Sequence, residues 1–586
     1  MARFSVIRIP ATSKGLNTTP GGAIRAAALA TTVLATAAPC WAADVTTDRL
    51  INADKEPQNW LMNHRTYDGQ RFSPLSRINK DTVKNLKLAY AVALGGTAGD
   101  EWTEATPLVE DGFIYVTDSG GVVYKIDGTS GQAGRIVWRM EPKQEKQANN
   151  RGASLWGNLV ISPANWPARI VATDKETGKV VWETNVVFGQ EDTRITAAPL
   201  AIKDKIIVGA SGGDAGVRDW IAGLDAATGK VLWRKFTIPA PGEPGSETWK
   251  DRNNAWQTGG AAVWVTGTYD PGTNQTIWGT GNPVPMFDPT YRPGDNLYTN
   301  SAISWDPDTG AMNWYFQYTP GDMWDYDEIG THILIDGQVA GEPRKLITHS
   351  ARNGHLYTMD RNNGQIIGAK PYTTVNWTRG IDQKTGKPLD YDPTREIQIY
   401  GGIGNLNPNE PLKKVCPSLS GGNNFWPSSY SQKTKLLYIP ALSNCITITI
   451  DREKHNKERG WNGGASTITE PWESDLTAAD PVTLEIKKSI HLRYPTLSGA
   501  LSTAGGLIFI ALLDGTVAAY DDATLDELWK INLGMPFKAP PMTFEFNGRQ
   551  YVAIASGGGP SARRRLANTP ELRDQRNATV LFVFGL

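Results

Sequence analysis

DKETGKVVW at Asp174–Trp182, DAATGKVLW at Asp225–Trp233 and DPDTGAMNW at Asp306–Trp314 repeat one phrase, in which an Asp and a Thr-Gly turn precede a Trp. Looser copies of the phrase end at Trp138 and Trp529. An apolar run precedes each Asp, so the phrase is typical of a β-hairpin. The Asp caps a tight turn, the Gly supplies a positive φ, and the next strand carries the aromatic side chain.

The copies of this phrase can be counted along the chain. Copies without Trp begin at Asp360 and Asp480, and an opening copy lies near Leu86–Val92, which makes eight units in all. Repetition at a period of some tens of residues is typical of one supersecondary unit stacked many times. We therefore predict an all-β fold, an eight-bladed β-propeller that occupies the whole mature chain.

The composition fits a large, exported β protein. The 586 residues include 60 Gly, 37 Pro and 21 Trp, only 20% are charged, and the net charge is −1. This near-neutral charge gives no indication of a nucleic-acid partner or of an acidic membrane surface. No run of ~20 apolar residues follows the N-terminal segment, so we expect no membrane span in the mature protein.

The N-terminal segment is typical of a targeting signal. Basic residues up to Arg25 precede the apolar stretch AAALATTVLATAAP, and small side chains near Ala42 suit cleavage. We predict a signal peptide over residues 1–42, a single propeller over residues 43–586 and a periplasmic location. The alternative is an N-terminal helix of a cytosolic protein.

Cysteine usage follows from export. Cys40 leaves with the signal, and Cys416 and Cys445 remain. Two thiols in an oxidising compartment are expected to pair, although two separate buried thiols are the alternative. No Cys-x-x-Cys-His motif occurs, so we expect no covalently attached haem.

Short motifs in the middle of the chain carry the functional signal. In chain order they are TRITAAP at Thr193–Pro199, SGGDAGVRD at Ser211–Asp219, TGGAAVW ending at Trp264, GTGNPVP around Asn282, RPGDN at Arg292–Asn296, WDYD at Trp324–Asp327 and HSARNG around Arg352. Each motif alone is weak, but their order resembles the methanol/ethanol dehydrogenase family of PQQ-dependent quinoproteins. The resemblance covers essentially the whole mature chain and implies an eight-bladed propeller without a haem domain, with PQQ and one metal ion as cofactors.

The resemblance also assigns catalytic and metal-binding residues. It gives the metal ligands as Asp214, Asn282 and Asp325, with Asp327 as a candidate fourth ligand. It makes Asp325 the catalytic base and Arg352 the cation that bonds the quinone oxygen. These residue types suit the chemistry, because a hard cation prefers oxygen ligands and an alcohol must lose its proton to a base. Taken alone, WDYDE fits a solvated acidic hairpin equally well.

Asp327 bears on the identity of the metal. Residues two apart in a strand face the same side, so Asp325 and Asp327 can point into one cavity. In the family an Asp at this position marks the lanthanide-dependent members, and an extra carboxylate suits a trivalent ion. At Asp214 the family usually has Glu, whose longer side chain reaches further. The sequence therefore favours a lanthanide and leaves calcium open.

By the same resemblance, Trp264 forms the floor beneath the PQQ ring. The residues matched to those that bind the edge of the cofactor are Arg151, Thr196, Ser211, Gly212, Gly213, Asp214, Arg352 and Asn424. PQQ carries three carboxylates, which an Arg and several hydroxyl or amide donors suit. Turn capping is the alternative for each polar residue, and core packing is the alternative for Trp264.

Some positions depart from the family. The adjacent Cys pair that usually covers PQQ is absent from QEKQANNRG, Leu497 stands where a Trp is usual, and Ala262 replaces a hydroxyl residue. These changes predict a roomier pocket and a primary or secondary alcohol bulkier than methanol. The charged stretches at Asp451–Gly464 and Ala562–Leu566 are expected to be solvated surface, and the first is also a candidate rim of the site.

The sequence thus predicts a periplasmic quinoprotein alcohol dehydrogenase, in which metal-polarised PQQ accepts a hydride from the alcohol. Electrons are expected to pass to a separate periplasmic cytochrome c, and a homodimer is left open. The alternatives are a non-catalytic propeller scaffold and a PQQ-dependent sugar or polyol dehydrogenase. A scaffold has no reason to keep acidic, amide and Arg groups in one buried funnel, because unpaired buried charge is costly.

Overall fold

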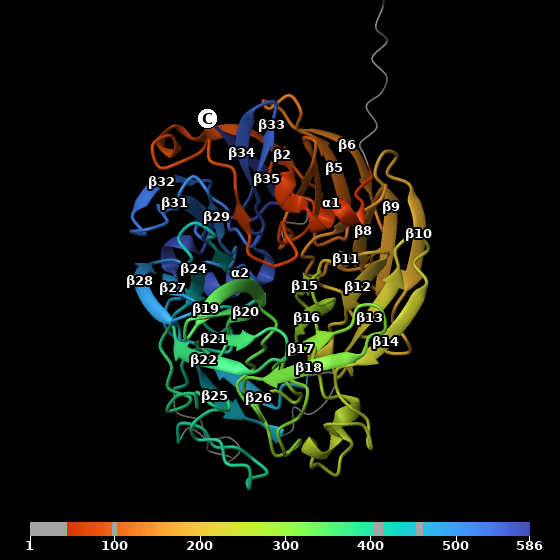
Figure 1. Ribbon diagram of the computed structural model, residues 1–586, viewed down its shortest axis with the longest axis vertical. Coiled ribbons are helices and arrows are strands. Elements are labelled where there is room, and N and C mark those ends of the chain that lie inside the picture. Colours follow the sequence, from red (N-terminus) through yellow and green to blue (C-terminus); the bar gives the residue numbers. More distant parts are fainter. Residues whose placement is uncertain (1–43, 96–101, 403–413, 453–460) are drawn as a thin grey trace, which may run out of the picture. The chain divides into compact units, whose positions relative to one another are not determined.

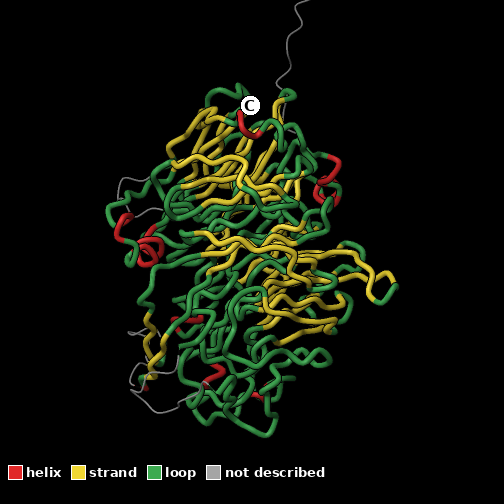
Figure 2. Tube along the Cα trace, turned by 90° about the vertical axis from the view of Figure 1, so that its left-hand side faces the viewer, coloured by secondary structure: helices red, strands yellow, loops and turns green. Residues whose placement is uncertain are grey.

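The computed structural model describes residues 44–95, 102–402, 414–452 and 461–586. Within these ranges the chain forms eight antiparallel blades, one of which gains a parallel strand, and a separate two-stranded hairpin (Figure 1). The helices among them are short (Figure 2). The predicted eight-bladed β-propeller is therefore confirmed. The predicted signal peptide, residues 1–42 with Cys40, lies outside the described residues.

The first four blades follow one another along the chain. The first has β3–β6 (Leu108–Glu110, Phe113–Thr117, Val123–Asp127, Arg135–Met140), and the second has β7–β10 (Ser154–Trp156, Leu159–Ala164, Arg169–Asp174, Val180–Asn185). The third has β11–β14 (Leu200–Ile202, Lys205–Gly209, Trp220–Asp225, Val231–Phe236). The fourth has β15–β18 (Thr268–Asp270, Gln275–Gly279, Ser301–Trp305, Met312–Gln317).

The remaining blades are less regular. The fifth has β19–β22 (Ile333–Val339, Glu342–Ser350, His355–Asp360, Ile366–Pro371), and the sixth has β23, β24, β27 and β28 (Ser429–Tyr430, Leu437–Leu442, Ser474–Asp480, Glu485–Leu492). The hairpin β25–β26 (Thr447–Ile450, Gly464–Thr467) is inserted within the sixth. The seventh has β29–β32 (Leu501–Thr503, Leu507–Ala511, Thr516–Asp521, Glu527–Asn532) with β1 (Phe72–Ser73). The eighth has β33–β35 (Met542–Phe546, Arg549–Ala555, Val580–Gly585) with β2 (Lys87–Ala93).

Strands from the two ends of the chain close the ring. β2 pairs antiparallel with β35, with Lys87 opposite Gly585, and the two lie side by side in Figure 1. β1 pairs parallel with β29 of the preceding blade. The predicted opening copy at Leu86–Val92 is therefore the outer strand of the last blade rather than a separate hairpin. The pairing of β2 with β35 joins the two ends of the chain within one blade and closes the ring.

The repeated phrase joins the third and fourth strands of a blade, and its Trp docks onto the turn of the next blade. Trp138 in β6 donates its indole N–H to the carbonyl oxygen of Lys175 at 2.9 Å. The ring lies against Gly178, whose φ is 70°, and a Cβ there would come within 2.8 Å of Trp138. The Gly of the phrase therefore provides both the turn and the room for the neighbouring blade's Trp.

The same contact repeats around the ring. Trp182 donates to the carbonyl of Ala226 at 3.2 Å, and Trp233 donates to that of Pro307 at 3.0 Å. Trp529 donates to Leu86 at 3.0 Å, across the junction between the seventh and eighth blades. The second and third blades thus each supply an indole to one neighbour and a turn to the other, whereas the copies at Asp360 and Asp480 have no Trp to supply.

Two further features bear on the sequence predictions. Cys416 and Cys445 form the predicted disulfide, which lies just before β25. Among the residues that the structure describes, no helix is long and apolar enough to cross a membrane. The two α-helices of the described residues are α1 (Thr47–Ile51) and α2 (Gly559–Leu566).

Candidate active site

All of the predicted site residues line one cavity of about 420 Å³. They are Arg151, Thr196, Ser211, Gly212, Gly213, Asp214, Trp264, Asn282, Asp325, Asp327, Arg352 and Asn424. Most stand in the loops that lead into or out of blade strands, where propellers and other rigid scaffolds commonly carry function. The structure thus brings predicted site residues that are spread from residue 151 to residue 424 into one cavity.

Close packing of two loops places the carboxylate of Asp214 in the cavity. The short 3₁₀ helix Gly213–Ala215 carries Asp214 into the cavity between β12 and β13. A Cβ on Gly213 would lie 2.9 Å from the Cα of Gly260, so only Gly allows these two loops to approach. Trp461, at the end of the charged stretch predicted as a candidate rim, packs within 2.6 Å of where a Cβ on Gly216 would be.

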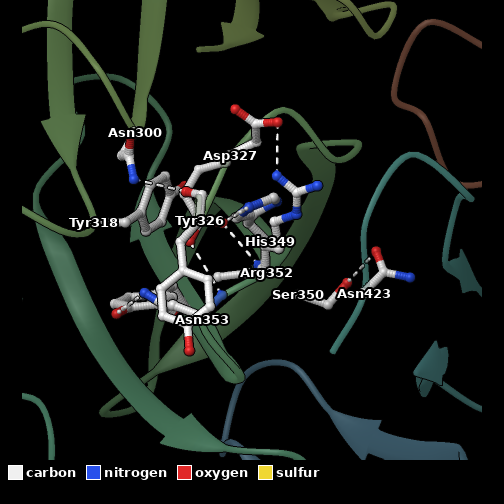
Figure 3. Close-up of polar contacts among 12 residues, drawn as sticks. Asn300, Tyr318, Tyr326, Asp327, His349, Ser350, Arg352, Asn353 and Asn423 are labelled. Carbon is white, nitrogen blue, oxygen red and sulfur yellow. Dashed lines mark hydrogen bonds and ion pairs between the residues drawn. The ribbon is translucent and has the colours of Figure 1, made fainter. Parts of the chain in front are cut away.

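The loop between β18 and β19 carries two of the acids, and Arg352 holds them. Its guanidinium lies 2.6 Å from a carboxylate oxygen of Asp327, and Figure 3 shows these two groups facing each other. The same nitrogen donates to the main-chain carbonyl of Asp325 at 2.8 Å and lies 3.6 Å from its carboxylate. Asp325 has a φ of 65°, a conformation that a non-Gly residue rarely adopts. One buried Arg therefore fixes both acids.

A buried carboxylate supports Arg352 from behind. Glu328 accepts a hydrogen bond from the backbone N–H of Arg352 at 2.9 Å, and its carboxylate lies 3.0 Å from Nε2 of His349. The His349 ring stacks on His332 with centroids 4.1 Å apart. Glu328 is the last residue of WDYDE, and the sequence motif gave it no role. Its contacts make it a positioning residue for Arg352.

The charges of the acids oppose one another. Burial, followed by repulsion from Asp327 and Asp214, raises the pKa of Asp325 well above its usual range, although the nearby Arg352 lowers it. Enclosure by the cavity and repulsion from Asp327 raise the pKa of Asp214 to about 6, while Arg352 and Asn282 lower it. A cation among these oxygens would relieve the repulsion. The donor set therefore fits a hard metal ion.

Asp327 is already engaged by three donors. Besides Arg352, the backbone N–H of Asn282 donates to it at 2.5 Å and the indole N–H of Trp264 donates at 3.2 Å. Within the described ranges, no three His, Cys, Asp or Glu side chains converge on one point as a compact metal centre. The metal roles of Asp214, Asn282, Asp325 and Asp327 therefore stay predictions.

Aromatic and cationic groups meet at the predicted cofactor floor. The guanidinium of Arg151 lies 4.5 Å from the ring of Trp264 and 4.9 Å from that of Phe425. It also pairs with Glu104 at 2.6 Å. Thr196 lies 3.3 Å from Ser211, hydroxyl to hydroxyl. A flat aromatic surface edged by an Arg and hydroxyl groups fits a planar, carboxylated molecule.

Several lining residues were not predicted. Glu104, Phe425, Lys538, Arg564 and Arg565 line the same cavity. The expectation of solvated surface for Ala562–Leu566 is wrong for Arg565, because α2 carries this side chain into the cavity. Apolar residues at positions 562 and 566, one helical turn apart, were the signal that one face of this segment is buried.

The structure also corrects the argument from Leu497. This residue is fully buried and packs in a cluster with Trp426, Ala562 and Leu566, so α2 fills the space beside it. It does not line the cavity. The smaller side chain therefore makes room for a helix rather than for a substrate, and only Ala262 of the two small replacements faces the cavity.

An eight-bladed propeller whose loops gather acids, an Arg and a Trp around one cavity is the arrangement that the sequence resemblance to quinoprotein dehydrogenases implies. Residues 60–375 and 465–552 match the family described as PQQ, glucose/ethanol/alcohol dehydrogenase, beta-propeller domain. The quinohemoprotein alcohol dehydrogenase of Comamonas testosteroni is 36% identical over 542 residues, which cover 87% of this chain and 74% of that protein. The quinoprotein alcohol dehydrogenase PedH of Pseudomonas putida is 33% identical over 546 residues, covering 88% and 89%.

Solved structures agree with these relatives. A europium-containing methanol dehydrogenase superposes with a TM-score of 0.84 at 28% identity, covering 92% of this chain and 100% of that one. The chain belongs to the PQQ-dependent alcohol dehydrogenase family, and it is an enzyme. Membership implies PQQ and a metal ion as cofactors, an alcohol as substrate and a redox acceptor. The alternative of a non-catalytic scaffold is thereby rejected.

Proposed function

We propose that this protein oxidises an alcohol in the periplasm with Asp325 as the catalytic base, and that its electrons pass to a cytochrome c. The observation that carries the proposal is the convergence of Asp325, Arg352 and Trp264 on one cavity. PQQ supplies, when bound, a carbonyl that accepts a hydride, and the metal ion supplies a Lewis acid. The remaining tasks fall to side chains of this chain.

Asp325 is suited to hold the hydroxyl proton. Its burial raises its pKa and so its affinity for a proton, while the positive charge of Arg352 at 3.6 Å favours the ionised form that can accept one. Arg352 orients the acid through the carbonyl of Asp325. The proton moves from the alcohol oxygen to a carboxylate oxygen of Asp325.

The cofactor would lie on Trp264. Its carboxylates and carbonyls would be held by the residues predicted from the sequence, which are Arg151, Thr196, Ser211, Gly212, Gly213, Asp214, Arg352 and Asn424. The metal would be held by Asp214, Asn282 and Asp325, with Asp327 as the fourth ligand. Two observations support this ligand set. These side chains supply oxygen donors, and the pKa values of Asp214 and Asp325 are raised, a shift that a bound cation would reverse.

We propose a lanthanide as the metal, with calcium as the alternative. The argument rests on Asp327, whose carboxylate adds negative charge among the other acids. A europium-containing methanol dehydrogenase among the similar structures supports this choice. Because Arg352, Asn282 and Trp264 already bind Asp327, ligation by this residue would require an exchange of partners.

The periplasmic location rests on two features. Residues 1–42 have the pattern of a cleaved signal peptide. The disulfide between Cys416 and Cys445 suits an oxidising compartment. A cytochrome c is the acceptor that we propose for such a location.

The proposal can be tested by reconstitution. Cofactor-free protein is titrated with PQQ and either La³⁺ or Ca²⁺, and reduction of an artificial electron-acceptor dye by primary and secondary alcohols is measured. We expect turnover that needs both additions and that the Asp325→Asn variant lacks while it still binds PQQ. A preference for glucose or polyols would instead favour the sugar or polyol dehydrogenase.

A further inference from the structure

A basic cluster lines the cavity on the side of the eighth blade and α2. It consists of Lys538, just before β33, and of Arg564 and Arg565 in α2. Lys538 is only 2% exposed. Arg565 is half-buried and Arg564 is exposed. A cation that is taken out of water is unusual unless something negative balances it, because it loses its hydration.

Within the described residues the protein balances this cluster only in part. Glu104 forms ion pairs with both Lys538 and Arg151, so one carboxylate serves two cations. Arg565 donates instead to neutral oxygens, the hydroxyl of Ser420 at 2.8 Å and the carbonyl of Ser561 at 3.2 Å. Its Nε is buried without a hydrogen-bond partner. Nε of Arg151 and of Arg352 is unpartnered too, but each of these guanidiniums pairs with a carboxylate. Arg565 differs in that its partners among the described residues are neutral.

Arg565 lines the same cavity as Asp325 and Arg352. Burial lowers the pKa of Arg565 to about 10, and repulsion from Arg564 and Arg352 contributes. Arg565 thus stays charged at neutral pH. A substrate with its hydroxyl at Asp325 would extend past these cations. An apolar alcohol would cover them without replacing their water, whereas an anion would pair with them.

We propose that the substrate is a hydroxy acid, a primary alcohol whose far end carries a carboxylate bound by Arg565 with help from Arg564 and Lys538. The inference rests on the proposed function. In the reaction the –CH₂OH group becomes –CHO. The carbon gives up a hydride with two electrons to PQQ, the hydroxyl proton goes to Asp325, and the carboxylate is unchanged.

The first test compares substrates of equal size and different charge. We expect kcat/KM of the reconstituted wild type to be about tenfold or more higher for 4-hydroxybutyrate than for 4-hydroxybutyramide, the gain typical of a charge-assisted hydrogen bond. The series glycolate, 3-hydroxypropionate, 4-hydroxybutyrate and 6-hydroxyhexanoate then gives the distance between the two ends. Added salt should raise KM for the acid more than for the amide, because it screens the pairing.

The second test uses substitutions on one helix. Arg565→Gln should lower the ratio of the two kcat/KM values by about tenfold. Arg563→Gln is the control, because Arg563 lies on the same helix but does not line the cavity. It should leave the ratio at its wild-type value. Thermal unfolding of both variants checks that they fold, and the salt dependence of the wild type tests the proposal if they do not.

Each other outcome has a definite meaning. Equal kcat/KM for acid and amide in the wild type overturns the proposal. If Arg565→Gln weakens PQQ binding, measured by quenching of tryptophan fluorescence, and leaves the ratio unchanged, the basic cluster binds the cofactor and the proposal is also overturned. If no alcohol, charged or neutral, reduces the dye after PQQ and metal are added, the proposed function itself fails.

Discussion

The cavity has two oppositely charged sides, and they differ in how the sequence encodes them. The acidic cluster, Asp214, Asp325 and Asp327, is countered by Arg352. Of the basic cluster, Lys538 pairs with Glu104, while Arg565 has neutral partners among the described residues. The acids stand in motifs on neighbouring loops, whereas the cations come from a segment before β33 and from a C-terminal helix. Residues common to a family can thus be found from motifs, whereas the side proposed to bind the substrate depends on where the fold brings unrelated segments together.

The largest expected effect lies in the acidic cluster. Asp325→Asn keeps the shape of the side chain but removes the base, so kcat should fall by about 10³-fold or more. PQQ binding measured by absorbance should persist, which separates loss of catalysis from loss of cofactor. Near-normal turnover in this variant would place the base elsewhere.

The two countercharges can be compared directly. Arg352→Gln leaves the acids without their cation, and Glu104→Gln leaves Arg151 and Lys538 without their carboxylate. Each should lower the free energy of unfolding of the metal-free protein by about 3 kcal/mol, because each leaves a buried charge unpaired.

Metal distinguishes these two variants. Added La³⁺ should restore the melting temperature of Arg352→Gln, since a cation can replace the lost positive charge among the acids. It should restore that of Glu104→Gln much less, because the metal would sit on the other side of the cavity. Equal recovery in both variants would show that the clusters are not independent.

A smaller effect concerns the choice of metal. Asp327→Ala removes one anionic oxygen and also the partner of Arg352, so activation by La³⁺ should weaken about tenfold more than activation by Ca²⁺. The measurement is dye reduction as a function of metal concentration at saturating PQQ. A wild type that responds to Ca²⁺ and ignores La³⁺ would contradict the role given to Asp327.

The sequence predicted the fold because its signal is local. Each Asp-turn-Trp phrase forms a hairpin by itself. The contact of Trp138 with Gly178 recurs in later copies of the phrase, which can be recognised along the sequence. The role of Leu86–Val92 could not be read in the same way. Its partner β35 lies at the other end of the chain, and nothing in a seven-residue strand specifies a partner so distant.

The site residues also divide into those with a local sequence signal and those without one. Asp325 and Arg352 stand in recognisable motifs, so their placement together was predictable. Lys538 is a single Lys before a strand, and Arg565 belongs to a run of Arg that usually covers surface. Leu497 was interpreted as added space because α2, which occupies that space, has no counterpart in the motifs.

The smallest expected effect provides a reference outside the cavity. His355, in β21, is 2% exposed, and burial lowers its pKa to about 3. Between that value and about 6.5 the unfolded chain binds a proton that the native protein does not, so stability falls as the pH falls through this window. The loss is up to about 1.4 kcal/mol per pH unit for one such residue.

His355→Phe keeps a ring among the same neighbours and removes the titration, so its unfolding free energy should depend less steeply on pH between 6.5 and about 4 than that of the wild type. Chemical denaturation of metal-free protein at several pH values measures both slopes. Because the proposed metal site lies in the cavity and His355 does not line it, adding La³⁺ should leave the difference between the two slopes unchanged. A difference that disappears with metal would mean that the acidic cluster, and not His355, controls stability in this pH range.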